Sequence, residues 1–225
     1  MTSAKLTERL RAESGETWTA VVEHPFTDAL ALGDIDEDAM RYYLIQDHRF
    51  VDAFVVLLAS MVAAAPTLKD RIPGCQFLGL VTGKENTYFE RSLDALGVTN
   101  EQRLVENTPN DPATTGFQNL MRSAAKSGSY TQMLAVLVVA EWSYLSWGDR
   151  VKNQRNPQKP FWCMEWIDLH CGEYFESVIA YLRGLLDTAG ETMTAEEEGK
   201  CRAIFLEAVQ LEKAFFDAAW AKRKL

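Results

Sequence analysis

The segment 133–145 reads MLAVLVVAEWSYL and decides the fold. Apolar side chains cover nearly the whole circumference of the helix that it would form, and such a helix is stable only when other helices surround it. Ser129 precedes the segment as a candidate N-cap, so we expect a central helix from there to about Val151. The longest uninterrupted apolar run, Met133–Ala140, is far shorter than the roughly 20 residues that a membrane span requires.

Apolar residues at spacings of three and four predict the remaining helices, and no segment has the alternating pattern of a β-strand. We expect one helix over residues 6–23 and a second from residue 36 to the alanines before Pro66. A third is expected after Pro73-Gly74 and as far as residue 96, and two more over residues 114–126 and 161–186. His24-Pro25 and Gly190 are expected to end helices. Thr194 and Glu197 form a capping box that opens a last helix, which continues to the C-terminus. Because the connections are short, residues 1–225 are predicted to form one all-α domain, a helical bundle around the central apolar helix.

The composition is typical of a folded protein, since 47% of the 225 residues are hydrophobic and 24% are charged. The net charge is −9 and the basic residues gather only at Lys222-Arg223-Lys224, which disfavours binding to nucleic acid. Four cysteines are scattered without a C-x-x-C pair, and residues 2–15 are too polar for a signal segment. We therefore expect a cytoplasmic protein with reduced thiols and without a nucleic-acid or membrane partner.

Ionisable residues on the apolar helix faces give the first indication of a site. Four acids and one histidine occupy buried positions of five different predicted helices: Asp47, Glu85, Glu141, Glu212 and His170. Each alone is compatible with a boundary residue that reaches water or pairs with a neighbouring cation. Together they predict a shared interior site, because burial and the proximity of like charges shift pKa values toward those of catalytic groups.

Carboxylates inside a helix bundle are also typical of di-iron and di-manganese proteins. Those sites need a Glu-x-x-His motif on two helices, and none of His24, His48 and His170 has a glutamate three positions before it. His24, which precedes Pro25, is more typical of a helix end than of a haem ligand. A metal- or haem-dependent oxidase is therefore only an alternative. Its candidate ligands would be Glu85, Glu141, His170 and either Glu173 or Glu212.

Five short segments carry a family resemblance through their order and spacing. They are His24-Pro25-Phe26, Tyr43–Asp47, Glu141–Tyr144, Trp166-Ile167, and Glu212 with Phe215–Ala219. Together they resemble the TenA family of thiaminase-II-like aminopyrimidine aminohydrolases, over nearly the whole chain. The resemblance implies a helical fold like that of haem oxygenase, usually assembled as a homotetramer. It also implies a pocket for a small-molecule substrate, the pyrimidine part of degraded thiamine, and no metal or organic cofactor.

The resemblance assigns roles to three residues at matching positions. Asp47 matches the family aspartate that hydrogen-bonds the aminopyrimidine. Tyr144 matches the tyrosine four residues past the family nucleophile, and Glu212 matches the C-terminal catalytic glutamate.

Four positions depart from the usual family pattern. Ala140 stands at the position of the nucleophilic cysteine, and Phe50, His170 and Phe117 stand where tyrosines are usual. No other cysteine is in register to replace the nucleophile. The pattern resembles the cysteine-lacking branch of the family, which is associated with salvage of aminomethylpyrimidine and its N-formyl derivative. Loss of the nucleophile would also fit a non-catalytic protein that binds thiamine or a pyrimidine, and this is the second functional alternative.

Without a cysteine thiolate, hydrolysis requires an activated water. A carboxylate with a raised pKa can take the proton from that water and return it to the leaving amine. We assign Glu212 and Glu141 as this acid–base pair; Glu141, one position after Ala140, is turned about 100° around the helix and could still face the pocket. The candidate substrate-binding residues are Asp47 as the anchor, Tyr144, Phe50, Phe117 and Trp142 as wall or stacking residues, and His170 as a hydrogen-bond donor.

Overall fold

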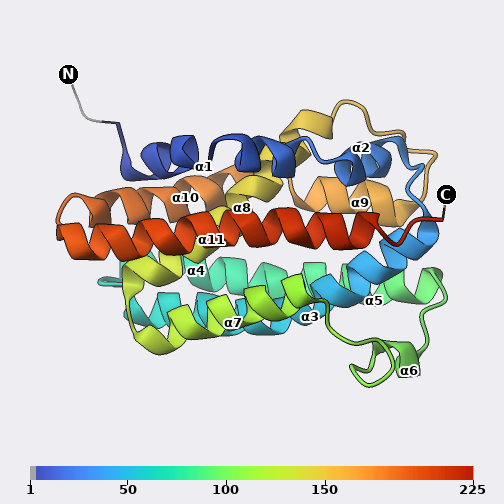
Figure 1. Ribbon diagram of the computed structural model, residues 1–225, viewed down its shortest axis with the longest axis horizontal. Coiled ribbons are helices and arrows are strands. Elements are labelled where there is room, and N and C mark those ends of the chain that lie inside the picture. Colours follow the sequence, from blue (N-terminus) through green and yellow to red (C-terminus); the bar gives the residue numbers. More distant parts are fainter. Residues whose placement is uncertain (1–3, 225) are drawn as a thin grey trace.

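The computed structural model describes residues 4–224, which form helices joined by turns and loops, without a strand in that range. The α-helices are α1 (Leu6–Val22), α2 (Pro25–Leu32), α3 (Glu37–Ala64), α4 (Leu68–Leu80), α5 (Asn86–Ala95), α6 (Asn100–Arg103), α7 (Pro112–Ser127), α8 (Tyr130–Val151), α9 (Phe161–Leu169), α10 (Glu173–Gly190) and α11 (Ala195–Trp220), and a π-helical turn, η1 (Val81–Glu85), joins α4 to α5. Figure 1 shows α11 running along the whole bundle, with α1 and α10 on one side and α3, α4 and α7 on the other. The prediction of an all-α bundle is confirmed.

The apolar segment forms the centre of the bundle, as predicted. α8 packs against α1, α3, α7, α10 and α11, and every residue of Met133–Ala140 is buried. Ser129 is its N-cap and accepts a hydrogen bond from the amide of Gln132 at 3.4 Å. The capping box of Thr194 and Glu197 opens α11, since each side chain accepts a hydrogen bond from the other's amide. Within the described residues, no helix is long and apolar enough to cross a membrane.

The prediction that His24-Pro25 ends a helix holds for α1 but misses α2, which begins at Pro25. Proline is well suited to the first helical position, because the amide that it lacks would have no partner there. His24 has extended backbone angles and caps α2, with its Nδ1 accepting a hydrogen bond from the amide of Phe26 at 3.1 Å. The same residue pair therefore ends one helix and starts the next.

The helix predicted to end at residue 96 does not begin after Pro73-Gly74, and that prediction is wrong. α4 begins at Leu68, behind the N-cap Thr67, and Pro73 lies inside it. The Thr67 side chain accepts a hydrogen bond from the amide of Asp70 and so marks the start of the helix ahead of the proline. A Cβ on Gly74 would lie 2.5 Å from a methyl carbon of Val62, so the glycine lets α4 approach α3 closely. The π-helical turn η1 then extends this region to α5 and was also not predicted.

The helix predicted over residues 161–186 is broken into α9 and α10. α9 ends at Leu169, and α10 starts after Gly172, whose φ of 86° only glycine adopts readily. At this break, Gly148 of α8 touches the backbone of His170, where a Cβ would lie 2.2 Å from the carbonyl oxygen. The break, and the glycine that accommodates it, determine where His170 lies.

The first half of α3 is fixed to the loop between α6 and α7 by polar side chains. The Gln46 amide donates to the carbonyl oxygen of Pro109 and accepts from the amide of Asp111, each at 3.0 Å. Three residues further along, the Arg49 guanidinium donates to the carbonyl oxygen of Arg103 at 2.9 Å. These bonds hold the turn of α3 that faces the interior of the bundle.

Candidate active site

A narrow cavity of about 30 Å³ lies inside the bundle, between α3, η1, α8 and α9. Its walls are Asp47, Phe50, Val51, Phe54, Glu85, Ala140, Glu141, Tyr144, Trp166 and His170. Neither lysine nor arginine is among these residues, whereas three of them carry carboxyl groups. The predicted convergence of acids from separate helices is therefore present in the structure.

Asp47 is the most enclosed carboxyl group of the cavity wall, with 5% of its surface exposed. Its Oδ2 atom is buried without a hydrogen-bond partner. Burial raises the pKa of Asp47 to about 7, and the nearby hydroxyl of Tyr43, one turn earlier on α3, acts in the opposite direction. Near neutral pH the group therefore exists in both protonation states, and its free oxygen is available to a ligand in the cavity.

Glu85 and Glu141 face the same cavity from η1 and α8, and both are half-buried. Burial and the neighbouring Asp47 raise the pKa of Glu85 to about 8. Burial, then Glu85 and Asp47, raise the pKa of Glu141 well above its ordinary value. Neighbouring carboxyl groups resist losing their protons together, because each carboxylate raises the pKa of the next. We therefore expect some of these acids to keep a proton while others are ionised.

Glu212 of α11 lies behind the cavity wall, and it is 2% exposed. Its Oε1 atom is buried without a hydrogen-bond partner. Burial, followed by Asp47 and Glu141, raises its pKa well above the ordinary value. Since Asp47 and Glu141 influence it electrostatically, Glu212 belongs to the same cluster of acids, although it does not itself line the cavity.

A hydroxyl network supports one side of the cavity. The hydroxyl oxygens of Tyr43 and Tyr144 lie 2.7 Å apart, and the indole N–H of Trp166 donates to the Tyr43 oxygen at 3.2 Å. Tyr144 and Trp166 line the cavity, and Tyr43 joins them from behind. In the sequence, Tyr43 and Trp166 are recognisable only as parts of the family segments. The position of Tyr43 four residues before Asp47, on the same helical face, could have indicated this role.

His170 lines the cavity, but the structure contradicts its predicted role as a hydrogen-bond donor. Its Nδ1 lies 2.8 Å from the carbonyl oxygen of Trp166, which can only accept, so Nδ1 carries the proton. Burial lowers the pKa of His170 to about 4, and the ring is therefore neutral near pH 7. Nε2 is then left with its lone pair and can only accept a hydrogen bond from a ligand.

Two of the predicted aromatic wall residues are adjacent. Phe50 lines the cavity, and its ring meets that of Phe117 edge to face at a centroid distance of 5.0 Å. Phe117 is completely buried and is not part of the cavity wall, so it holds Phe50 from behind. Phe54, the next aromatic residue of the wall along α3, stacks on Phe50 at a centroid distance of 5.8 Å.

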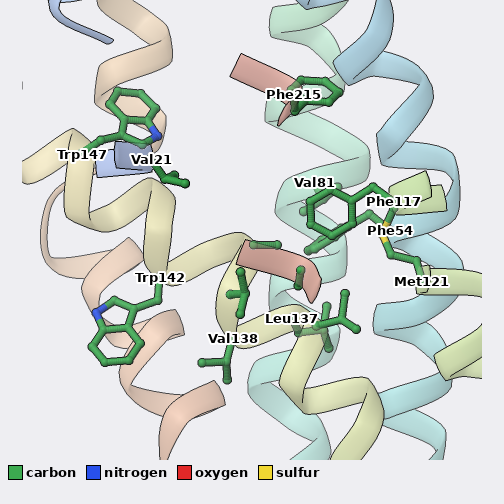
Figure 2. Packing of buried hydrophobic residues seen from close by; sticks show 14 of the residues in the cluster. Val21, Phe54, Val81, Phe117, Met121, Leu137, Val138, Trp142, Trp147 and Phe215 are labelled. Carbon is green, nitrogen blue, oxygen red and sulfur yellow. The ribbon is translucent and has the colours of Figure 1, made fainter. Parts of the chain in front are cut away.

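Trp142 was predicted as a wall residue, and the structure places it elsewhere. Its ring packs on Trp18 of α1 at 5.1 Å, and the Arg183 guanidinium lies 3.7 Å from its ring centre. In Figure 2 it lies on the opposite side of the view from Phe54 and Phe117. The reason is the helical rotation of about 100° per residue: Glu141 faces the cavity, so its neighbour faces α1 instead.

His24 lies at a helix end, the role that the sequence favoured over that of a haem ligand. Its Nδ1 accepts from the Phe26 amide, and its Nε2 lies 3.2 Å from a carboxylate oxygen of Asp217. Both ring nitrogens are therefore engaged within the protein. Glu173, another candidate ligand, is exposed at the start of α10, outside the cavity. Among residues 4–224, no three His, Cys, Asp or Glu side chains are grouped so that they could hold a metal ion.

Comparison with solved structures gives the same fold. A TenA homologue from Pyrococcus furiosus superposes with a TM-score of 0.84 at 22% identity, over 95% of this chain and 99% of that one. Haem oxygenase 2 from Chlamydomonas reinhardtii superposes with a TM-score of 0.65 at 16% identity, over 96% and 97% of the two chains. The predicted haem-oxygenase-like fold is confirmed.

Comparison of sequences identifies the family. The aminopyrimidine aminohydrolase of Halalkalibacterium halodurans is 23% identical over 206 residues, which cover 92% of this chain and 91% of the relative. The model of the TENA/THI-4/PQQC family matches residues 11–222, nearly the whole chain. The chain belongs to the TENA/THI-4/PQQC family.

Proposed function

We propose that this protein is a hydrolase of thiamine salvage that cleaves a C–N bond of aminomethylpyrimidine or of its N-formyl derivative. One observation carries the proposal: four buried or half-buried carboxyl groups occur in one cluster, and the cavity that three of them line contains no cationic side chain. They are Asp47, Glu85, Glu141 and Glu212. The naming of similar proteins as aminopyrimidine aminohydrolases supports it.

Substrate binding is assigned to the cavity wall. The free oxygen of Asp47 is suited to accept a hydrogen bond from the exocyclic amine of a pyrimidine. Nε2 of His170 offers a second acceptor, and the rings of Phe50 and Tyr144 offer apolar faces for the heteroaromatic ring. Because the cavity is narrow, we expect the half-buried Phe50 to move when a ring enters.

Hydrolysis is assigned to Glu141 and Glu212 acting on a water molecule. One carboxylate takes a proton from water as its oxygen forms a bond to the substrate carbon, and a protonated carboxyl group gives a proton to the departing nitrogen as the C–N bond breaks. Burial and the neighbouring carboxyl groups raise the pKa values of Glu141 and Glu212, and a carboxyl group with a raised pKa is suited to exchange protons with water and with a leaving nitrogen. Ala140 presents only a methyl group beside Glu141, so a cysteine thiolate has no part in this mechanism.

The test is turnover of both pyrimidines by the wild type, Glu212→Gln and Glu141→Gln. Glutamine keeps the shape of the side chain but cannot exchange a proton, so we expect kcat to fall by about 100-fold or more in each variant. The matched control is Glu207→Gln, an exposed position on the same helix as Glu212, which should leave kcat unchanged. Unchanged rates in both cavity variants would refute the assignment.

A non-catalytic pyrimidine- or thiamine-binding protein is the second candidate, and Ala140 at the nucleophile position is the observation in its favour. The two functions differ in one readout. Tight binding of a pyrimidine by the wild type without product over hours, followed by mass spectrometry, would support the binding protein and exclude the hydrolase.

A further inference from the structure

A second hollow lies beside the cavity, on the surface between α3 and η1. It is a groove of about 340 Å³ lined by His48, Val51, Asp52, Val55, Val56, Val81, Thr82 and Asn86. We call it the outer groove. It contains much more space than the cavity, which holds about 30 Å³.

The two hollows share a wall. Val51, one turn after Asp47 on α3, lines both of them. On the opposite side, Glu85 lines the cavity, and the next residue, Asn86, lines the outer groove. The wall between the cavity and the groove is therefore one residue thick at these points. One side of the Val51 side chain faces the cavity, and another faces the groove.

Side-chain contacts of His48 connect α3 to the start of α5 beside this wall. His48 Nε2 lies 3.0 Å from the Asn86 side-chain oxygen, and the His48 ring also stacks on Phe89 at 5.1 Å. α3 and the start of α5 are thus tied together beside Val51. A change in the size of Val51 should therefore alter the opening without separating the two helices.

The chemistry of the groove differs from that of the cavity. Its walls include the valines Val51, Val55, Val56 and Val81, and Val56 is 47% exposed. An apolar group reaching out of the acidic cavity would find apolar contacts there. Because the cavity is narrow and shares Val51 with the outer groove, a substituent on a bound ring can extend past Val51 into the groove.

We propose that the outer groove is the entrance to the cavity and a subsite for the group carried on the substrate's amino nitrogen, and that Val51 limits the size of that group. This inference rests on the proposed function and names its substrate class more closely: N-acyl aminomethylpyrimidines with short apolar acyl groups. Val51 is a specificity-determining residue in this account, and no step of the chemistry passes through it.

The experiment compares N-formyl, N-acetyl and N-butanoyl aminomethylpyrimidine as substrates of the wild type, Val51→Ala and Val51→Phe. A pocket wall that gains or loses methyl groups changes discrimination by about tenfold or more. We therefore expect Val51→Ala to raise the ratio of kcat/KM for butanoyl over formyl by about tenfold, and Val51→Phe to lower it. Val22→Ala, at a half-buried valine at the end of α1, is the matched control and should leave the ratio unchanged.

Equilibrium binding of the same three compounds, measured by calorimetry, gives a second readout that does not need turnover. If the wild type hydrolyses none of them, the proposed function fails, and the ratio of dissociation constants still tests the groove. A ratio that stays within twofold of the wild type in both Val51 variants, by kinetics or by binding, overturns the inference. If Val51→Phe does not fold, Val51→Ala alone decides.

Discussion

Replacing Gly148 by alanine would place a methyl group against the backbone that carries His170. A Cβ at this position would lie 2.2 Å from the carbonyl oxygen of His170 and 3.0 Å from its carbonyl carbon. Carbon and oxygen normally approach to about 3.3 Å, so one of the two segments must move by about 1 Å. Both neighbours are backbone atoms, which cannot rotate away as a side chain would.

The displacement has two consequences. Overpacking of this kind typically costs about 1–3 kcal/mol of stability. Moving a residue of the cavity wall by about 1 Å is expected to lower kcat/KM by roughly 100-fold. The assays are urea unfolding and the hydrolysis of aminomethylpyrimidine, both compared with the wild type.

Gly184→Ala is the matched control for Gly148→Ala, because Gly184 also lies inside a helix and nothing lies within 4 Å of its added Cβ. The control should stabilise the protein by about 0.5–1 kcal/mol, since alanine favours the helix, and it should leave turnover unchanged. If Gly148→Ala behaves like the control, the close approach of α8 to the α9–α10 turn does not position His170, and the reasoning is refuted.

Two further variants test the cavity from α3. Because burial raises the pKa of Asp47 to about 7, the folded protein keeps a proton that the unfolded chain loses above about pH 4. As pH rises from about 4 to about 7, the free energy of unfolding of the wild type should therefore fall relative to that of Asp47→Asn. The slope of this difference is at most about 1.4 kcal/mol per pH unit. Urea unfolding at several pH values measures it, and parallel pH profiles of the two proteins would contradict this. Tyr43→Phe removes the acceptor of the Trp166 indole N–H and should cost about 1–3 kcal/mol as well as lower kcat, whereas Tyr174→Phe, at a residue that is 49% exposed, should change neither.

Much of the interior could be predicted from the sequence because helical periodicity reports which residues share a buried face. The central helix followed from the apolar run at Met133–Ala140, and the registers of Asp47, Glu141 and His170 placed them toward a common interior. The single domain, the homotetramer and the cytoplasmic location stay predictions.

The remaining features depend on contacts between segments that are distant in the sequence. Trp142 follows Glu141 directly and is apolar, which made it a candidate for the cavity wall. Its packing on Trp18 shows that it faces α1 instead. The position of His170 depends on the close approach of Gly148 to its backbone at the break between α9 and α10. The close approach of α4 to α3 depends on Gly74, where a Cβ would lie 2.5 Å from a methyl carbon of Val62. Periodicity describes one helix at a time and therefore contains none of this information.

The most direct test of the acidic cavity is a carbon-13 NMR titration of the Asp and Glu carboxyl groups, with Asp47→Asn and Glu85→Gln used for assignment. Exposed carboxyl groups titrate near pH 4. The account predicts that the Asp47 resonance titrates near pH 7 and that of Glu85 near pH 8, with Glu141 and Glu212 also well above the ordinary range. Titration of all four groups below about pH 5 would show that they are solvated separately, and would contradict the shared cavity on which the proposed chemistry depends.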